Sequence, residues 1–516
     1  MNKMKIQAIV WIFCVNIEEN LEVIMKLKHL QNGSDIRGVA LPGISGEDVT
    51  LTKEAVYELS RGFVTFLREK LNKKDIKIAV GHDSRLSADA LCHSIFDGLL
   101  FDGVNVLDCG LASTPSLFMS CIFEDFDCDG AIMVTASHLP FNRNGMKFFT
   151  KEGGLNKEEI ARIIEISETE AYDHIVGGSL TKSNLMDAYS LHLQNVIRNA
   201  LKDEKPLSNL HIVVDAGNGA GGFYVEKVLK PLGANTSGSQ FLEPDGNFPN
   251  HIPNPEDKEA MDSICKAVKE AKADLGIIFD TDVDRSSAVD RFGNPISRNA
   301  IVALASIIAG IDHPNTTIVT DSVTSDELHT FLEEKGFTHH RFKRGYKNVI
   351  NEAIRLNEEG VDCQLAIETS GHAALKENYF LDDGAYLATK IVIEAAKHPV
   401  DALIQDLKHP LEEKELRFKI TIPEFQSYGD MVLEDLKTFV ASNDDMRPAD
   451  VNHEGYRVSF DHGWFLLRKS LHDPILPCNI ESTKEGGCKE IARALYTFLK
   501  EYEHLDLSAI ESFIKE

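Results

Sequence analysis

Short apolar runs alternate with amphipathic segments along most of this chain. The runs at residues 76–81, 275–279 and 363–367 have the length and apolar content of buried strands. The segments at residues 88–100 and 299–309 have the length and pattern of helices. Strands that alternate with helices form parallel or mixed sheets that helices cover. The sequence therefore predicts an α/β protein.

The alternation recurs in three similar stretches, and the C-terminal stretch differs from them. Apolar and polar residues alternate there at residues 418–422, which predicts a strand. Residues 455–459 and 464–468 are expected to form further strands, with helices on one side. Consecutive strands with flanking helices indicate an α+β domain. We therefore expect three similar mixed-sheet α/β domains plus a C-terminal α+β domain. The expected boundaries are a poorly ordered leader at residues 1–30, domain I at 31–190, domain II at 191–297, domain III at 298–413 and domain IV at 414–516.

Charge and cysteine usage restrict the partners and the compartment. With 54 Lys and Arg against 81 Asp and Glu, the formal net charge of the 516-residue chain is −27. This charge repels nucleic acid and anionic membranes, so we expect neither as a partner. The nine cysteines occur singly, with no Cys-x-x-Cys pair, which is typical of reduced thiols rather than of disulfides or a zinc site. We therefore expect a cytoplasmic location.

The N-terminal leader contains an apolar run at residues 6–15. This run is too short to span a bilayer, and no Ala-x-Ala-like cleavage site follows it. Organellar transit peptides are rich in Arg and Ser, and the first 30 residues contain neither. The leader therefore leaves import into an organelle such as a plastid open without supporting it.

A serine follows the strand that we expect at residues 129–134. It is Ser137, in the segment T-A-S-H-L-P at residues 135–140, and we expect residues 144–147 to close this loop. A serine at the end of a strand can be held rigidly and exposed. The nearby His138 and Lys147 offer a general base and a cation for phosphate. The alternative interpretation is an ordinary surface loop.

Three alternating carboxylates follow the strand expected at residues 275–279. Asp280, Asp282 and Asp284 supply the oxygen ligands that a hard cation prefers. An EF-hand is excluded because Arg285 and Arg291 stand where its loop needs Gly and Glu. A solvated acidic turn is the other alternative, but a cation would relieve the repulsion among the three acids. We favour a metal site, with Mg²⁺ as the ion.

Three further segments are weaker signals when each is taken alone. Residues 217–222 satisfy G-x-G-x-x-G and fit either a dinucleotide site or a tight turn. Residues 368–372 (E-T-S-G-H) offer groups that can hydrogen-bond vicinal sugar hydroxyls. Residues 468–474 (R-K-S-L-H-D-P) offer cations and turn amides for a phosphate. Together with the serine and metal loops, they predict chemistry that moves phosphoryl groups on a sugar.

These loops resemble those of the α-D-phosphohexomutases, the phosphoglucomutase/phosphomannomutase family, and the similarity extends from Gly33 onward. The family's T-A-S-H-N-P, D-G-D-G-D-R and G-E-x-S-G-H loops are similar to residues 135–140, 280–285 and 367–372. Two loops depart from the family. The phosphate loop, usually R-P-S-G-T-E-P, is R-K-S-L-H-D-P here, and the specificity loop, commonly V-G-x-K, is R-G-Y-K at residues 344–347. Both departures leave the preferred hexose open.

The resemblance implies a fold in which the domains surround a central active-site cleft, and an isomerase that interconverts hexose 1-phosphates and hexose 6-phosphates. It implies a phosphoserine at Ser137 and a hexose 1,6-bisphosphate that serves as intermediate and activator. Mg²⁺ would be held by this serine and the three aspartates. Non-catalytic sugar-phosphate binding and metal-dependent sugar phosphatase activity are the alternatives. The partner is a hexose phosphate, and the chain is expected to be a monomer or a homodimer.

The resemblance also assigns roles to individual residues. His138 and Lys147 are candidates for general acid and base in either order, Arg37 supports the phosphoserine, and Arg285 adds positive charge. The expected substrate ligands are Gly345, Lys347, Glu368, Ser370, His372, Arg468, Lys469 and Ser470.

Overall fold

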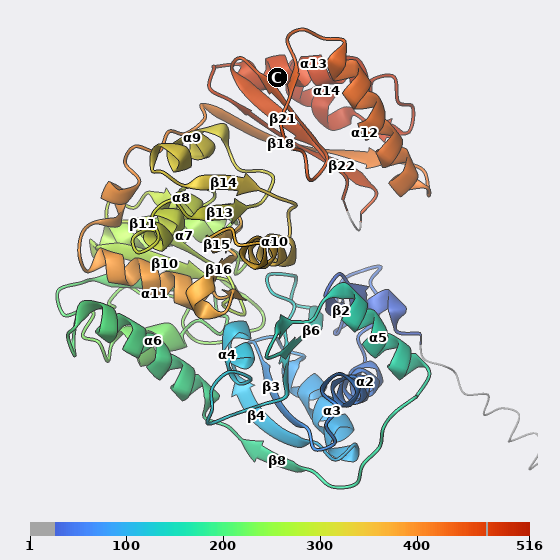
Figure 1. Ribbon diagram of the computed structural model, residues 1–516, viewed down its shortest axis with the longest axis vertical. Helices are drawn as coiled ribbons and strands as arrows, with labels where there is room; N and C mark the ends of the chain where they lie inside the picture. The colour runs from blue at the N-terminus through green and yellow to red at the C-terminus, as the bar shows by residue number, and fades with distance from the viewer. Residues whose placement is uncertain (1–25, 471–472) are drawn as a thin grey trace, which may run out of the picture. The chain divides into compact units, whose positions relative to one another are not determined.

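The computed structural model describes residues 26–470 and 473–516 (Figure 1). Most of the expected leader, together with Leu471 and His472, lies outside the described residues. The chain forms two compact units. The first runs to Met186 and includes residues 245–247, and the second comprises residues 187–244 and 248–516.

The first unit is built on an eight-stranded mixed sheet with the order β1-β2-β6-β5-β3-β4-β8, in which β7 pairs with β6. Strands β3, β4, β5 and β8 are parallel to one another, whereas β6 is antiparallel to both β2 and β5. The strands are β1 (Gln31–Asn32), β2 (Asp35–Val39), β3 (Lys77–His82), β4 (Asn105–Leu111), β5 (Gly130–Val134), β6 (Arg143–Thr150), β7 (Gly153–Gly154) and β8 (Ser179–Lys182). The helices are η1 (Lys28–Leu30), α2 (Lys53–Leu71), α3 (Ala88–Phe101), α4 (Thr114–Met119) and α5 (Lys157–Glu168).

Helix α2 shows why this unit folds as it does. Thr52 caps its first turn by accepting a hydrogen bond from Ala55 N at 3.2 Å. Its buried face includes Leu59, Phe63 and Leu67, at helical spacing. The Phe63 ring packs 4.9 Å from the ring of Phe148 on β6. The helix therefore joins the core of the sheet through its apolar stripe.

The start of this unit differs from the sequence expectation. Leu27 and Leu30 are buried in its core, and Leu27 N donates to Glu168 Oε1 at 2.6 Å. Residues 27–30 therefore belong to the folded unit and not to the leader expected at residues 1–30.

The second unit contains three sheets. The first has the order β12-β11-β10-β9, with only β9 and β10 parallel, and the second has the order β14-β13-β15-β16-β17, with β14, β13 and β15 parallel. The strands are β9 (Ile212–Asp215), β10 (Leu275–Phe279), β11 (Ser286–Asp290), β12 (Pro295–Ile296), β13 (Thr317–Thr320), β14 (Thr338–Arg341), β15 (Cys363–Ile367), β16 (Ala373–Leu375) and β17 (Leu381–Asp382). The helices are α6 (Leu185–Leu201), which begins at the end of the first unit, η2 (Tyr224–Leu229), α7 (Lys258–Ala271), α8 (Asn299–Gly310), α9 (Asp326–Glu334), α10 (Tyr346–Glu358), η3 (Lys376–Asn378), α11 (Gly384–Ala395) and η4 (Val400–Leu403).

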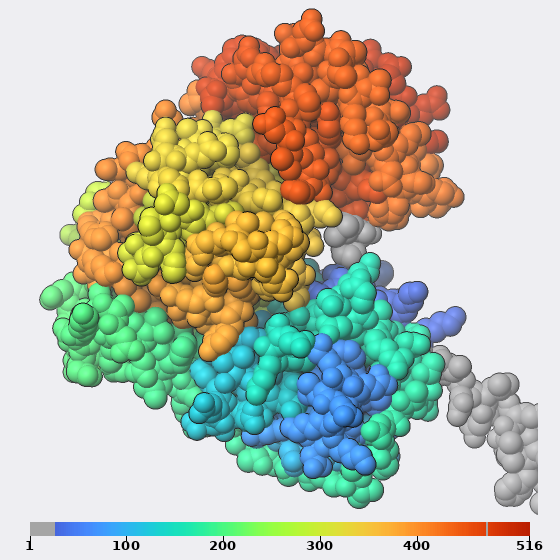
Figure 2. Space-filling view, in the orientation of Figure 1, coloured from blue at the N-terminus to red at the C-terminus, as the bar shows by residue number. Residues whose placement is uncertain are grey.

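The third sheet of the second unit is antiparallel throughout, with the order β19-β20-β21-β22-β18-β23. Its helices pack against the sheet through one shared core. The described residues of 412–516, which form this part, are drawn in orange to red in Figure 2. The elements are β18 (Glu412–Ile420), α12 (Phe425–Ala441), β19 (Arg447–Pro448), β20 (Tyr456–Phe460), β21 (Gly463–Leu467), β22 (Ile475–Ser482), α13 (Gly487–Leu499), β23 (Leu505–Asp506) and α14 (Ser508–Lys515).

Three mixed sheets and one antiparallel sheet confirm the predicted fold class. Strands β10 and β15 have the bounds expected from their apolar runs. Two details were wrong. Residues 144–147 lie in strand β6 and not in a loop, and β18 begins at Glu412, before the expected strand. The expected boundaries at residues 190–191 and 413–414 fall inside α6 and β18.

Across residues 26–470 and 473–516, no helix combines the length and the apolar content that a membrane span needs.

Candidate active site

The Ser137 loop joins β5 to β6 in the first unit. Ser137 has a left-handed backbone, with φ of 52°, and its side chain is buried. Its amide donates to Thr135 Oγ1 at 2.9 Å, and that hydroxyl donates to Asp83 Oδ2 at 2.7 Å. Non-glycine residues adopt this backbone at an energetic cost and are frequent at functional sites. The loop therefore presents Ser137 in a conformation that its neighbours hold in place.

Arg85 is the main support of this loop. Its guanidinium, which is fully buried, donates to the carbonyl oxygens of Ser137, Leu139, Pro140 and Arg143. Four carbonyls fixed by one planar group leave the loop little freedom. Arg85 was not among the predicted site residues. The segment G-H-D-S-R at residues 81–85, which ends in this arginine, was the signal that could have indicated it.

The other predicted catalytic residues of the first unit lie on the same part of the sheet. Arg37 on β2 is paired in register with Gly145 of β6, and Lys147 of β6 is paired with Met133 of β5. The Nδ1 atom of His138 lies 3.4 Å from Ser137 Oγ. Arg37 forms an ion pair with Asp35 at 3.0 Å, and Lys147 is buried. Neighbouring strands thus carry the two cations, and the loop between β5 and β6 carries Ser137 and His138.

In the second unit, the connection from β10 to β11 holds three buried carboxylates. One oxygen from each of Asp280, Asp282 and Asp284 lies within 4.8 Å of the others. Burial, reinforced by the charges of Asp284 and Asp282, raises the pKa of Asp280 well above its usual range. Val283 lies between two of the acids with φ of 66°, a backbone region that favours glycine. The loop is therefore costly in charge and in backbone conformation, as expected of a functional site.

Arg285 balances part of this negative charge. Its Nε donates to Asp280 Oδ2 at 3.0 Å, and its Nη1 donates to Asn254 Oδ1 at 3.1 Å. Burial lowers the pKa of Arg285, but the carboxylates of Asp280 and Asp284 outweigh burial and raise it. Arg285 therefore offsets part of the negative charge of the three carboxylates. This donor set fits a divalent cation with oxygen ligands.

Residues 368–372, the predicted sugar loop, are joined by backbone contacts to the acidic loop at residues 280–285. Arg285 and His372 form an antiparallel β-bridge, and Ser286 N donates to Gly371 O at 3.3 Å. A Cβ atom on Gly371, whose φ is 95°, would lie 2.6 Å from Ser286 O, so only glycine fits this approach. The two loops predicted separately from the sequence are therefore neighbours in the second unit.

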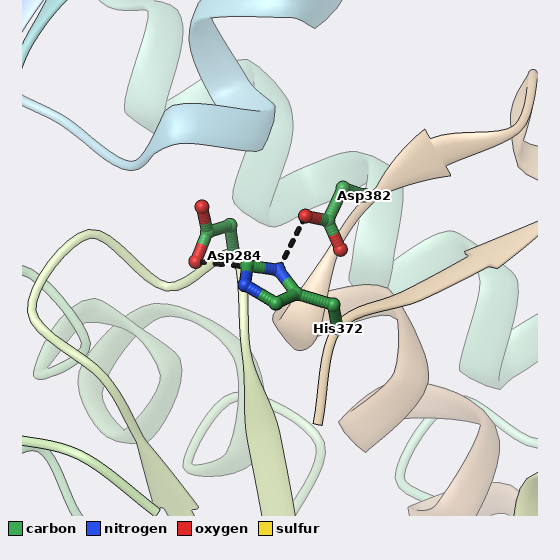
Figure 3. Close-up of side chains that lie close together, drawn as sticks. All are labelled: Asp284, His372 and Asp382. Atoms are coloured by element: carbon green, nitrogen blue, oxygen red, sulfur yellow. Dashed lines mark hydrogen bonds and ion pairs between the residues drawn. The ribbon is translucent and has the colours of Figure 1, made fainter. Parts of the chain in front are cut away.

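His372 lies between two carboxylates (Figure 3). Its Nδ1 is 2.5 Å from Asp382 Oδ2 and 3.9 Å from Asp284 Oδ1, and its ring stacks on Tyr346 at 5.2 Å. Burial lowers the pKa of His372, but the charges of Asp382 and Asp284 prevail and raise it to about 9. The imidazole is therefore protonated at neutral pH. Nothing in the sequence pointed to Asp382, which lies beyond the recognisable loop.

Glu368 and Ser370 form the polar part of the sugar loop. Glu368 Oε1 accepts a hydrogen bond from Gly345 N at 2.6 Å, which ties this loop to the start of α10, where Lys347 also lies. Burial and the nearby carboxylate of Asp321 raise the pKa of Glu368 to about 7. The buried Ser370 Oγ has no hydrogen-bond partner within the described part of the chain. An unpartnered buried hydroxyl is suited to a ligand hydroxyl.

The side chains of the predicted phosphate loop have different partners in the structure. Arg468 lies 3.8 Å from Glu454, and its Nε is a buried donor with no partner among residues 26–470 and 473–516. Lys469 does not accompany it, because its ammonium pairs with Asp430 of α12. Ser470 Oγ accepts a hydrogen bond from the amide of Asp473 at 3.1 Å. Lys469 thus pairs with helix α12, whereas Arg468 pairs with Glu454.

Arg344 was overlooked as an individual residue. It follows β14, and its guanidinium lies 3.8 Å from Glu256. Burial lowers its pKa, but the charges of Asp321, Glu256 and Glu368 prevail and raise it. Its position in the R-G-Y-K segment was the available signal. Arg344 therefore adds a cation beside the sugar loop.

Comparisons with known proteins identify relatives of this chain. Family models for phosphoglucomutase/phosphomannomutase alpha/beta/alpha domains I, II and III match residues 28–174, 187–293 and 297–410. A phosphoglucomutase of Neisseria gonorrhoeae is 30% identical over 478 residues, covering 91% of this chain and 96% of that protein. A phosphomannomutase/phosphoglucomutase of Pseudomonas syringae is 30% identical and covers 90% of this chain and 94% of its own length. A crystal structure of a family member from Burkholderia thailandensis superposes with a TM-score of 0.76 at 26% identity, covering 92% of this chain and 98% of that one.

Proposed function

This chain belongs to the phosphoglucomutase/phosphomannomutase family, and from that premise we propose that it interconverts hexose 1-phosphates and hexose 6-phosphates. The observation that carries the proposal is the joining of the acidic loop to the sugar loop by the bridge between Arg285 and His372. A cation site and a hydroxyl-binding site are thereby built as one piece. The strained, buried serine loop of the first unit supplies the phosphoryl carrier.

A divalent cation fits the residues of the acidic loop. Asp280, Asp282 and Asp284 would hold it, with a phosphoserine oxygen as a further ligand. Mg²⁺ is the proposed ion because it binds carboxylates and phosphate oxygens together. Bound there, it would supply Lewis-acid stabilisation of phosphoryl oxygens.

The proposed first step moves the phosphoryl group from Ser137 to a sugar hydroxyl. The bond from phosphorus to Ser137 Oγ breaks and a bond from phosphorus to the sugar oxygen forms; the hydroxyl proton passes to one of His138 and Lys147, and the other gives a proton to Ser137 Oγ. In the second step, the bond from the other phosphorus to its sugar oxygen breaks and a bond to Ser137 Oγ forms; Ser137 gives up its proton and the sugar oxygen gains one, through the same two residues. Arg37 supports the charge of the phosphoserine. A standing phosphate is needed because a serine hydroxyl is a weak nucleophile without activation.

The substrate is held by residues of the second unit. Glu368 and Ser370 bind sugar hydroxyls, and His372, protonated by its carboxylate neighbours, donates to an anionic oxygen. Gly345 and Lys347 line the segment that distinguishes one hexose from another. Arg468 and Ser470 bind the phosphate that is not reacting. The hexose 1,6-bisphosphate acts as intermediate and as activator.

Location and assembly complete the proposal. We propose a cytoplasmic enzyme that acts as a monomer or a homodimer, with a hexose phosphate as its partner. The eight cysteines of the described residues are free thiols, which supports a reducing compartment.

A coupled assay tests the function. Purified protein with Mg²⁺ and a trace of glucose 1,6-bisphosphate should convert glucose 1-phosphate or mannose 1-phosphate to the 6-phosphate. Ser137→Ala should abolish this turnover while leaving the unfolding temperature unchanged, because it deletes one hydroxyl. Release of inorganic phosphate in place of the 6-phosphate would indicate a phosphatase. Tight hexose phosphate binding with no turnover would indicate a binding protein.

A further inference from the structure

In the second unit, the carboxylate of Glu454 lies between the backbone amide of Arg344 and the guanidinium of Arg468. Glu454 Oε2 accepts a hydrogen bond from Ser322 Oγ at 2.6 Å and another from the backbone amide of Arg344 at 3.0 Å. Its Oε1 lies 3.8 Å from Arg468 Nη1. A hydroxyl, an amide and a guanidinium therefore converge on one anion.

The surroundings of this carboxylate have the donor set of a phosphate site. Burial lowers the pKa of Arg468, and the positive charge of the nearby Arg344 lowers it further. The side chain of Arg468 is 12% exposed, and its Nε has no hydrogen-bond partner in the described chain. The Arg468 guanidinium, the Ser322 hydroxyl and the backbone amide of Arg344 are donors of the kind that bind a phosphoryl group.

Glu454 is carried by a segment that is fixed on both sides. On one side, the ring of His453 packs 4.8 Å from Phe342. On the other, Arg457 donates from Nη1 to the carbonyl oxygens of Ser322 and Thr324, at 3.2 and 3.1 Å. These contacts fix the segment on both sides of Glu454 and so hold its carboxylate at this position.

We propose that Glu454 is a positioning residue whose carboxylate occupies the Arg468 guanidinium, the Ser322 hydroxyl and the Arg344 amide whenever no phosphate lies there, so that a substrate phosphate binds by replacing the carboxylate. The inference rests on the proposed function, because that function places a phosphate at Arg468. The exchange serves the reaction directly. The bisphosphate intermediate must reorient between the two steps, and for this its bound phosphate must leave Arg468. The Glu454 carboxylate then takes the place of that phosphate and offsets the lost contact.

Glu454→Gln is the informative variant because its amide oxygen can still accept from Ser322 and Arg344 while the charge is removed. We expect inorganic phosphate, measured by calorimetric titration, to bind about fivefold more tightly. The gain corresponds to the loss of one partly exposed ion pair, that of Glu454 with Arg468, which competes with phosphate in the parent protein. In the mutase assay, both KM and kcat should fall, because phosphate binds more tightly and leaves more slowly. A purely structural role would lower kcat without lowering KM.

Asp450→Asn is the matched control. Asp450 is exposed, lies in the same segment and changes the net charge equally, so phosphate affinity should not change. Equal gain in both variants, or unchanged or weaker phosphate binding in Glu454→Gln, would overturn the inference. Tighter phosphate binding in a protein without mutase turnover would uphold the role of Glu454 and refute the proposed function. Mutase turnover without tighter phosphate binding in Glu454→Gln would refute the role of Glu454 and uphold the proposed function.

Discussion

Removal of one carboxylate from the acidic loop should have opposite effects with and without a divalent cation. Asp282 lies within 4.8 Å of both Asp280 and Asp284, and all three are buried. At about that separation and an effective dielectric constant of about 20, each like-charge pair costs about 3.5 kcal/mol. The contacts of Arg285 and a proton on one acid relieve most of this repulsion. We therefore expect Asp282→Asn to stabilise the metal-free protein by about 1–3 kcal/mol.

The sign should reverse when Mg²⁺ is present. An ion that binds only the folded chain stabilises it by about 2.7 kcal/mol at a concentration of about 100 times its Kd. The parent protein should gain this stability, and Asp282→Asn should lose most of it because one ligand is missing. In EDTA the variant is the more stable protein, and in Mg²⁺ the parent is.

Thermal unfolding of both proteins in EDTA and in Mg²⁺ measures the crossover. Asp312→Asn is the matched control, because Asp312 is exposed and lies outside the acidic loop, and it should behave as the parent does. Two results would refute the reasoning. One is a variant that is less stable than the parent in EDTA, and the other is an equal gain from Mg²⁺ in variant and parent.

Three further predictions concern the remaining parts of the site and the C-terminal domain. Arg85→Lys should lower kcat by about 10²-fold and speed amide exchange around Ser137, because one ammonium cannot hold four carbonyls; a normal kcat would contradict this. Arg468→Ala should raise KM for glucose 1-phosphate by about tenfold, whereas Lys469→Ala should change it by less than about twofold. Burial, reinforced by nearby carboxylates, raises the pKa of Glu481 from 4.5 to about 8. The folded chain thus keeps a proton that the unfolded chain releases, so stability should fall as pH rises from 4.5 to about 8. Glu481→Gln should flatten that decline in urea midpoints, and an unchanged slope would disprove the assignment.

The sequence predicted best those elements whose burial is complete. Strands β10 and β15 are buried along their whole length, and their sequences, L-G-I-I-F and C-Q-L-A-I, are mostly apolar runs that end where a polar loop begins. Strand β6 was taken for a loop because its first residues, R-N-G, are typical of turns. Its strand conformation is set by pairing with β2 and β5, which a local pattern does not reveal.

The site was predictable where its chemistry is local. The three aspartates alternate within five residues, so their convergence follows from one loop. Asp382 and Glu454 were missed because their partners, His372 and Arg468, are brought to them by tertiary contacts. Lys469 was assigned to the phosphate because it adjoins Arg468 in sequence. In extended backbone, successive side chains point in opposite directions, which explains its pairing with Asp430.

The most direct test of the account is the location of the transferred phosphate. The protein is incubated with glucose 1,6-bisphosphate carrying labelled phosphorus, digested, and analysed by mass spectrometry, and a second sample is then treated with unlabelled glucose 1-phosphate. The account predicts label on the peptide containing Ser137, followed by its transfer to glucose 6-phosphate or to the bisphosphate. Label on another residue, or label lost from Ser137 only as inorganic phosphate, would contradict it.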